Sequence, residues 1–371
     1  MNILVISSIN HRTPAYHLIH ALKTIGHDVV AMSDTDSEFS DFVVPKAFRI
    51  RDYLNLEHFK ADLLLYIEGG SMEIFPLDLM EFEAKKFWWG IDTHLNFEKH
   101  LRISRLFDHT FIAQKEFVVS LTAYGIAATW LPLAYPSSID IAPKTSPKYD
   151  FSFIGQTDQT MYPERHRLIR KAQHAFPNNF VGTLEPKEML ETYNNSRVVI
   201  NQSIKNDINM RVFEVLGTSA VLVTNAIRNN GLEDLFENTK HLFTFETDEE
   251  LIFLLQNLVN NDATRIETAT AANELVLSRH TYFNRASEIL EFVSKPTVNL
   301  ITSPIDYSGA LMRIGLYADS LAFFILEMRS NAKSRKAKLV LTLITPCLFL
   351  GVGIASLTLR IVRGIKLASR S

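Results

Sequence analysis

Short apolar segments that alternate with helix-like segments constrain this fold more than any other feature. Residues 3–8 are a nearly continuous apolar run, typical of a parallel strand that is buried on both faces. A polar loop follows, and then a helical segment at 16–25 that ends before Gly26, a favourable residue after a helix C-terminus. The next strand is predicted at 28–32. This unit is Rossmann-like, but its loop lacks the three-glycine pattern that binds NAD or FAD.

The same alternation runs through two successive series. Further strands of the first series are predicted at 61–67, 86–90, 110–113 and 128–131. After a proline-containing stretch at 135–149, strands of the second series are predicted at 151–154, 180–181, 198–201, 221–224 and 241–245. We therefore expect an α/β protein with two Rossmann-like, doubly wound domains that face a cleft. The predicted domains are residues 1–140, residues 141–300 and a helical extension at 301–371.

Charge is distributed unevenly along the chain. The formal net charge is −3, yet residues 331–371 contain eight basic and no acidic residues, which leaves −11 for residues 1–330. An acidic body argues against nucleic-acid binding. Residues 339–359 carry no charge and would form a helix of roughly 30 Å, about the thickness of the hydrocarbon core of a bilayer. We expect a hydrophobic membrane-associating helix here, with membrane contact through 339–371; a buried soluble helix is the alternative.

The first residues do not resemble a secretory signal, because no basic segment precedes the apolar run. We therefore expect the catalytic body in the cytoplasm, membrane-associated through its tail. The only cysteine, Cys347, excludes an internal disulfide framework and a Cys-based zinc site.

An R-x-x-E segment after a polar loop is the first candidate site. Arg211 and Glu214 lie in a helix predicted at 210–216. A helix N-terminus presents free N–H groups and a positive dipole end, which suit a diphosphate. Arg211 can add a bidentate phosphate contact, and Glu214, one turn later, can accept hydrogen bonds from two ribose hydroxyls. The alternative is a surface helix with an ordinary Arg–Glu pair.

Several elements occur in an order that resembles a known family. They are YDFSFIG at 149–155, YNNSRVVIN at 193–201, RVFE at 211–214 and GLEDLF at 231–236, with WWGIDTH at 88–94 in the first series. Over about residues 60–290 the chain resembles GT-B glycosyltransferases, in particular the CgeB-like (spore-maturation type) branch of the glycosyl transferases group 1 superfamily.

The resemblance implies a donor site in the second domain. Glu214 would bind the ribose of a nucleotide-sugar donor, Arg211 its phosphates, and Gly155 would let the backbone approach the nucleotide. The implied donor-binding residues are Gly155, Arg165, Lys205, Asn206, Arg211 and Glu214. Retaining enzymes of this superfamily often have a glutamate where Asn206 stands, so this departure leaves the retaining or inverting outcome open.

The first domain supplies candidates for the acceptor side. Asp92 and His94 follow a predicted strand, where a carboxylate or an imidazole can deprotonate an acceptor hydroxyl. A helix-capping Asp beside a hydrogen-bonded His is the alternative. Further acceptor or cleft candidates follow other strands: His11, Arg12, Glu68 and Gly69. For these residues an exposed basic loop and a plain tight turn are the alternatives.

No metal-binding cluster stands out, since the acidic pair Asp34 and Asp36 fits a solvated loop. GT-B enzymes commonly hold the diphosphate with helix dipoles and basic side chains, so we expect no essential metal and no cofactor. The leading hypothesis is a glycosyltransferase that moves a sugar from a nucleotide-diphosphate sugar to a hydroxyl of a glycan, a lipid-linked glycan or a surface-polymer precursor. The alternatives are a catalytically degenerate membrane scaffold that binds nucleotide or glycan, and a sugar-nucleotide epimerase on the same fold.

Overall fold

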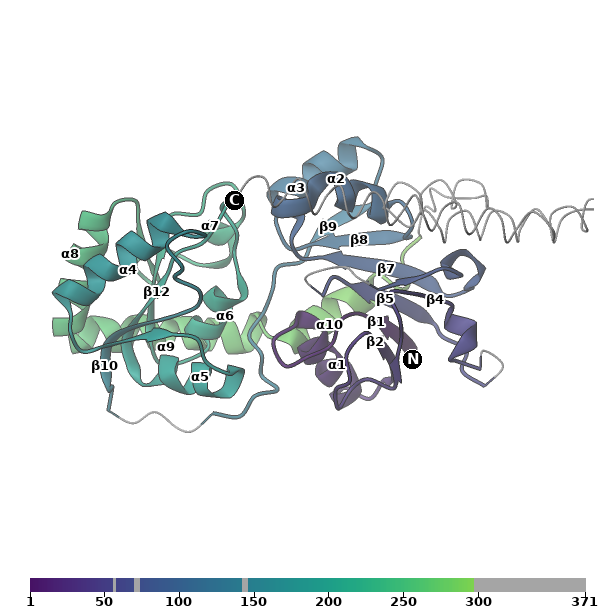
Figure 1. Cartoon of the computed structure of the whole chain (residues 1–371), viewed down its shortest axis with the longest axis horizontal. Coiled ribbons are helices and arrows are strands. Elements are labelled where there is room, and N and C mark those ends of the chain that lie inside the picture. Colours follow the sequence, from purple (N-terminus) through teal and green to yellow (C-terminus); the bar gives the residue numbers. More distant parts are fainter. Residues whose placement is uncertain (56–57, 70–73, 142–145, 297–371) are drawn as a thin grey trace, which may run out of the picture.

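A computed structural model describes residues 1–55, 58–69, 74–141 and 146–296 (Figure 1). Its first sheet has seven parallel strands in the order β3-β2-β1-β5-β7-β8-β9. The strands are β1 (Asn2–Ile6), β2 (Asp28–Ser33), β3 (Phe42–Val43), β5 (Leu63–Ile67), β7 (Lys85–Gly90), β8 (His109–Ile112) and β9 (Ala128–Trp130). Two short strands, β4 (Ala47–Phe48) and β6 (Phe75–Pro76), pair separately.

Helices cover both faces of the first sheet because alternate strand residues point to opposite sides. Ile3 and Val5 of β1 join one core with α1 (Pro14–Thr24), while Leu4 and Ile6 join another. That second core also contains residues of α2 (Thr93–Ser104) and α3 (Glu116–Ala123). Two single turns, η1 (Ile50–Asp52) and η2 (Leu79–Glu81), complete this part of the chain. A sheet that is buried on both sides explains why its strands are continuously apolar in sequence.

The second sheet has five parallel strands in the order β11-β10-β12-β13-β14. The strands are β10 (Tyr149–Ile154), β11 (Asn179–Gly182), β12 (Ser196–Asn201), β13 (Val221–Asn225) and β14 (Phe243–Phe245). The helices after β10 are α4 (Pro163–Ala175), α5 (Pro186–Asn194), α6 (Met210–Leu216), α7 (Leu232–Leu235), α8 (Asp248–Asn260), α9 (Asp262–Arg279) and α10 (Tyr282–Glu291). The α4 and α8 helices pack on one face of this sheet, and α5 and α6 pack on the other.

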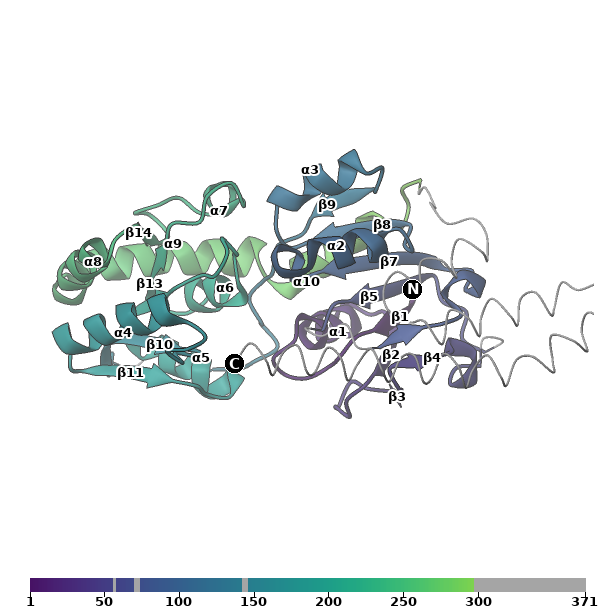
Figure 2. The ribbon, with the colours of Figure 1, turned by 45° about the horizontal axis from the view of Figure 1, so that its top comes forward.

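The last described helix, α10, returns to the first sheet and packs beside α1 (Figures 1 and 2). The Arg285 guanidinium, 2% exposed, donates from Nε to the Pro132 carbonyl at 2.7 Å and from Nη2 to the Leu133 carbonyl at 3.2 Å. The Tyr282 ring lies 5.3 Å from the His17 ring of α1. The chain thus crosses between the two sheets twice, and the core that contains α1 includes residues of both.

The predicted tail lies outside the described residues. This applies to the extension at 301–371 and to its hydrophobic segment at 339–359. Among the residues that the structure does describe, no helix is long and apolar enough to cross a membrane.

Candidate functional site

Side-chain contacts connect the loops of the first sheet with those of the second. Gln114 Nε2 donates to Asp207 Oδ1 at 2.8 Å, and this contact is shielded because Gln114 is only 1% exposed. The other two are ion pairs, Lys115–Asp234 at 2.9 Å and Arg12–Glu185 at 2.6 Å, whose side chains are all more than 40% exposed. Exposed ion pairs contribute little free energy to the contact between the domains, so the buried Gln114 contact is the more specific one.

Asp92 and His94, the predicted catalytic pair, lie at the carboxyl end of β7 and the start of α2. Asp92 is the N-cap residue, but its side chain makes no capping hydrogen bond, so the capping alternative does not account for it. Burial, followed by the negative charge of Glu68, raises the pKa of Asp92 to about 6. Burial also lowers the pKa of His94, and its Nδ1 has no hydrogen-bond partner among the described residues. A half-buried carboxyl with a pKa near neutrality is suited to proton transfer.

Glu68 does not line the cleft as predicted, because its side chain is 1% exposed. Its Oε2 accepts hydrogen bonds from the backbone N–H of Ile91 at 2.6 Å and of Asp92 at 2.8 Å. Its Oε1 lies 3.1 Å from His100 Nε2. Burial alone would raise the pKa of Glu68, but His100 and the two N–H groups lower it overall. Glu68 therefore fixes the backbone around Asp92, and it does so as a buried carboxylate.

Gly69 and the His11–Arg12 loop also have structural contacts. A Cβ at Gly69 would lie 2.5 Å from the Ser8 Cβ, so the glycine permits close packing of β5's end on the loop after β1. The His11 ring packs on Tyr16 at 4.5 Å. The Arg12 pair with Glu185 brings this exposed loop to the N-terminal end of α5, where both domains meet.

Arg211 is turned into the second domain. Its Nη2 donates to the Ile154 carbonyl at 2.5 Å, its Nη1 donates to Asn201 Oδ1 at 2.9 Å, and the guanidinium lies 4.9 Å from the centre of the Phe153 ring. A Cβ at Gly155 would lie 2.6 Å from Arg211 Nη2. Gly155 thus makes room for Arg211, and the guanidinium joins the carboxyl ends of β10 and β12. The phosphate contact of Arg211 stays a prediction.

Arg165 and Asn206, two other predicted donor-binding residues, also form hydrogen bonds within the protein. Arg165, 8% exposed, donates to the carbonyls of Gln156 at 3.2 Å and Gln202 at 2.7 Å, and burial lowers its pKa to about 10. Asn206 has a left-handed backbone (φ 64°), and its Oδ1 accepts from the Arg228 N–H at 2.7 Å. Both side chains therefore hold loops at the sheet's carboxyl edge, and their contact with a donor stays a prediction.

Lys205 precedes Asn206 in the same loop and is exposed, with φ 48°. Its charge contributes to lowering the pKa of His94, which places it near that imidazole across the domain interface. Lys205 is thus the predicted donor-binding cation whose side chain remains open to solvent.

Glu214 lies in a cavity of about 150 Å³ between the two domains. The cavity is lined by His11, Arg12, His17, Pro136, Ile139, Leu184, Pro186, Met189, Met210 and Glu214. The Glu214 side chain is 4% exposed. Burial raises its pKa to about 7, against the opposing effect of the Arg211 charge. A buried carboxyl in the wall of a cavity can accept hydrogen bonds from a ligand with donor groups.

The same cavity contains an incompletely bonded group, His17. Its Nδ1 lies 2.8 Å from Ser138 Oγ, while its buried Nε2 has no partner among the described residues. Burial lowers the pKa of His17 to about 3, so the imidazole is neutral. His11 and Arg12 also line the cavity, and proline, isoleucine, leucine and methionine side chains form the remaining wall. The cavity therefore combines an apolar surface with a few polar groups, as ligand sites do.

Glu214→Gln is expected to stabilise the free protein at pH 8 and to change little at pH 4. The folded-state pKa of about 7 exceeds the ordinary 4.5, so wild-type stability is lost as pH rises between these values. The loss amounts to about 3 kcal/mol at pH 8. Urea unfolding at both pH values measures it, with the exposed Glu267→Gln on α9 as the control. Equal stabilities of wild type and Glu214→Gln at pH 8 would contradict the burial argument.

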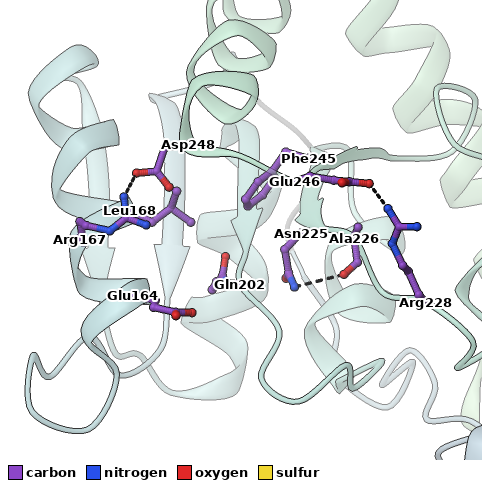
Figure 3. A pocket seen from close by; sticks show the side chains of 10 residues that line it. All are labelled: Glu164, Arg167, Leu168, Gln202, Asn225, Ala226, Arg228, Phe245, Glu246 and Asp248. Atoms are coloured by element: carbon purple, nitrogen blue, oxygen red, sulfur yellow. Dashed lines mark hydrogen bonds and ion pairs between the residues drawn. The ribbon is translucent and has the colours of Figure 1, made fainter.

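A second cavity, of about 290 Å³, opens at the carboxyl edge of the second sheet (Figure 3). Its two arginines already face carboxylates: Arg167 pairs with Asp248, and Arg228 pairs with Glu246. With its cations neutralised in this way, the cavity favours no single ligand class, so the Glu214 cavity is the better candidate.

No group of three His, Cys, Asp or Glu side chains among the described residues could hold a metal ion. Asp207, which the sequence analysis passed over, lies at the domain interface, and burial raises its pKa to about 6. The Gln114 and His17 side chains were also missed. Gln114 directly follows the strand end Ala113, a position that parallel sheets use for polar groups, whereas His17 lies inside a helix and gives no sequence signal.

Comparisons with known proteins agree with this architecture. Residues 139–291 match a family described as glycosyl transferase-like. A search of curated proteins gives no significant match. The T4 phage β-glucosyltransferase is similar in structure, with a TM-score of 0.57 and 13% identity over 80% of this chain and 100% of that one.

Two further solved structures are similar to the same extent. Anabaena HepE in complex with UDP-glucose has a TM-score of 0.57 and 11% identity, covering 80% of this chain and 100% of that one. A glycosyltransferase from Rickettsia africae has a TM-score of 0.55 and 11% identity, covering 79% and 98%. At these identities the likeness establishes the fold. Residues 139–291 therefore match the glycosyl transferase-like family, and the chain has the α/β fold with parallel sheets of GT-B glycosyltransferases.

Proposed function

We propose that this protein is a glycosyltransferase that moves a sugar from a nucleotide-diphosphate sugar to a hydroxyl group. The observation that carries the proposal is the buried Glu214 carboxyl, whose pKa burial raises to about 7 and which lies in a cavity walled by both domains. A ribose presents two adjacent hydroxyl donors, which together satisfy a carboxylate. The apolar side chains beside it suit a nucleobase.

The reacting groups would meet beside Asp92. Its carboxylate would take the proton of the acceptor hydroxyl while the acceptor oxygen bonds to the anomeric carbon and the nucleotide diphosphate leaves with the bonding electrons. This step applies to an inverting enzyme. In a retaining enzyme Asp92 would instead orient the acceptor or the donor sugar. Lys205, exposed near His94, is the cation that we assign to the departing diphosphate.

Uridine donors are the first to test, because the T4 phage enzyme and Anabaena HepE were solved with UDP-glucose. We propose a glycan, a lipid-linked glycan or a surface-polymer precursor as acceptor, and placement within the CgeB-like branch. We further propose that the reaction needs no metal or cofactor, that the body is cytoplasmic, and that residues 339–371 contact a membrane. The T4 phage enzyme has been solved with UDP and Mn²⁺, so metal independence needs its own test.

The decisive experiment measures binding and turnover with the full chain in detergent. UDP-, GDP-, ADP- and TDP-sugars are tested with extracted glycan and glycolipid acceptors, with either EDTA or Mn²⁺ present. We expect tight binding of one donor class and sugar transfer that persists in EDTA. Donor binding without transfer or hydrolysis across the panel would support a scaffold. Conversion of the donor without any acceptor would support an epimerase.

A further inference from the structure

Gln114 is a side chain that contacts both the Asp92 segment and the second domain. It follows Ala113 after the end of β8 and is 1% exposed. Its Oε1 accepts from the Thr93 N–H at 3.2 Å, and its Nε2 donates to the Ile91 carbonyl at 2.5 Å. The two contacts therefore flank Asp92 on both sides along the chain.

Glu68 holds the same segment from the opposite side. It accepts from the N–H groups of Ile91 and Asp92, while Gln114 accepts from the N–H of Thr93. All three consecutive N–H groups around Asp92 are thereby bonded to buried side chains. Such support fixes the direction of a reacting side chain and reduces the loss of precision that a loose loop causes.

The third contact of Gln114 reaches the second domain. Its Nε2 also donates to Asp207 Oδ1 at 2.8 Å. Asp207 lies in the loop between β12 and α6, directly before the helix that carries Glu214. The Ser203 hydroxyl donates to the Asp207 carbonyl, which ties this loop to the end of β12. Movement of the donor-binding domain relative to the first domain would therefore be transmitted to Gln114.

We propose that Gln114 is a positioning residue that couples domain closure to the orientation of Asp92. When the domains close over a donor, the Asp207 carboxylate engages the Gln114 amide and holds it against Ile91 and Thr93. When the domains separate, the amide loses this partner and the Asp92 segment loses part of its support. The inference rests on the proposed function, since it assigns Asp92 to the reaction.

The Lys115–Asp234 pair provides a matched control. It also joins the two domains, one residue further along the chain, but both side chains are about half exposed and neither contacts the Asp92 segment. If contact between the domains were all that mattered, loss of this pair would have the same effect as loss of the Gln114–Asp207 bond.

The experiment compares full-length variants in transfer kinetics and donor binding. Gln114→Met preserves the side-chain length but removes all three hydrogen bonds, and Asp207→Ala removes only the bond between domains. We expect both to lower kcat about 10- to 100-fold while the donor Kd changes less than about threefold, because neither residue lines the Glu214 cavity. Asp207→Asn retains an acceptor oxygen and should recover most of the rate. Lys115→Ala should stay within about twofold of wild type.

The double variant supplies the outcome that a merely structural role would not give. If one bond carries the effect of Asp207→Ala, adding that change to Gln114→Met lowers kcat no further. Multiplicative losses, or equal losses in Lys115→Ala, would overturn the proposal.

Domain closure is also measured directly, so that failure of the proposed function and failure of this inference are distinguishable. Spin labels in α3 and α8 report the distance between domains with and without UDP-glucose. Absence of transfer by wild type would count against the function alone. We expect Gln114→Met and Asp207→Ala to shift the distance distribution toward more open states relative to wild type and Lys115→Ala, with or without the donor. Identical distributions in all four proteins would reject the coupling.

Discussion

Glu214→Ala is expected to weaken donor binding by at least about 100-fold at pH 8. At that pH the wild-type carboxyl is largely ionised, because its pKa is about 7. A carboxylate that accepts from two hydroxyls contributes about 1.5–3 kcal/mol for each hydrogen bond, and alanine removes both. Isothermal titration with the donor that binds wild type gives the ratio of the two Kd values. The variant should remain folded, because alanine removes a carboxylate whose burial opposes folding at this pH.

The comparison with Glu214→Gln refines this result. Glutamine provides one acceptor oxygen in place of two and no charge, so its Kd should fall between those of wild type and Glu214→Ala. Wild-type binding should also weaken below about pH 7, as Glu214 gains its proton, whereas neither variant should follow that pH dependence. Donor binding by Glu214→Ala within threefold of wild type would remove this residue from the site.

The strands could be predicted from the sequence because strands of a parallel sheet that is covered on both faces consist of continuous runs of apolar residues. Residues 3–6 are apolar throughout since neighbouring residues of β1 enter two different cores. The path of α10 could not be predicted in the same way. Its amphipathic pattern shows that one face is buried, but not that Arg285 reaches back to carbonyls of the first domain.

For the candidate site, too, some features could be predicted from the sequence and others could not. Local spacing placed Glu214 in the helix after the polar loop and Asp92 at the end of a strand, and both have strongly raised pKa values in the structure. Whether a polar side chain at such an end faces a ligand or the protein depends on tertiary packing. Arg165 finds backbone carbonyls and Glu68 finds His100, because the neighbouring loops supply buried partners. Sequence position alone does not contain this information.

Asp92→Asn is expected to lower kcat by about 100- to 10,000-fold with little change in the donor Kd, if Asp92 is the base of an inverting transfer. Asparagine has the same shape and still lies on the segment held by Glu68, so binding and folding should persist. The wild-type rate should fall about tenfold for each pH unit below 6, because the base must be ionised and its pKa is raised to about 6. Asp207 also has a pKa of about 6, so the inflection is assigned by variants: it should persist in Asp207→Asn. The exposed Asp36→Asn is the control for charge removal.

Transfer by Asp92→Asn at more than half the wild-type kcat would exclude Asp92 as the base. If His94→Ala then abolished turnover, the role would pass to His94, whose burial keeps its imidazole neutral and able to accept a proton.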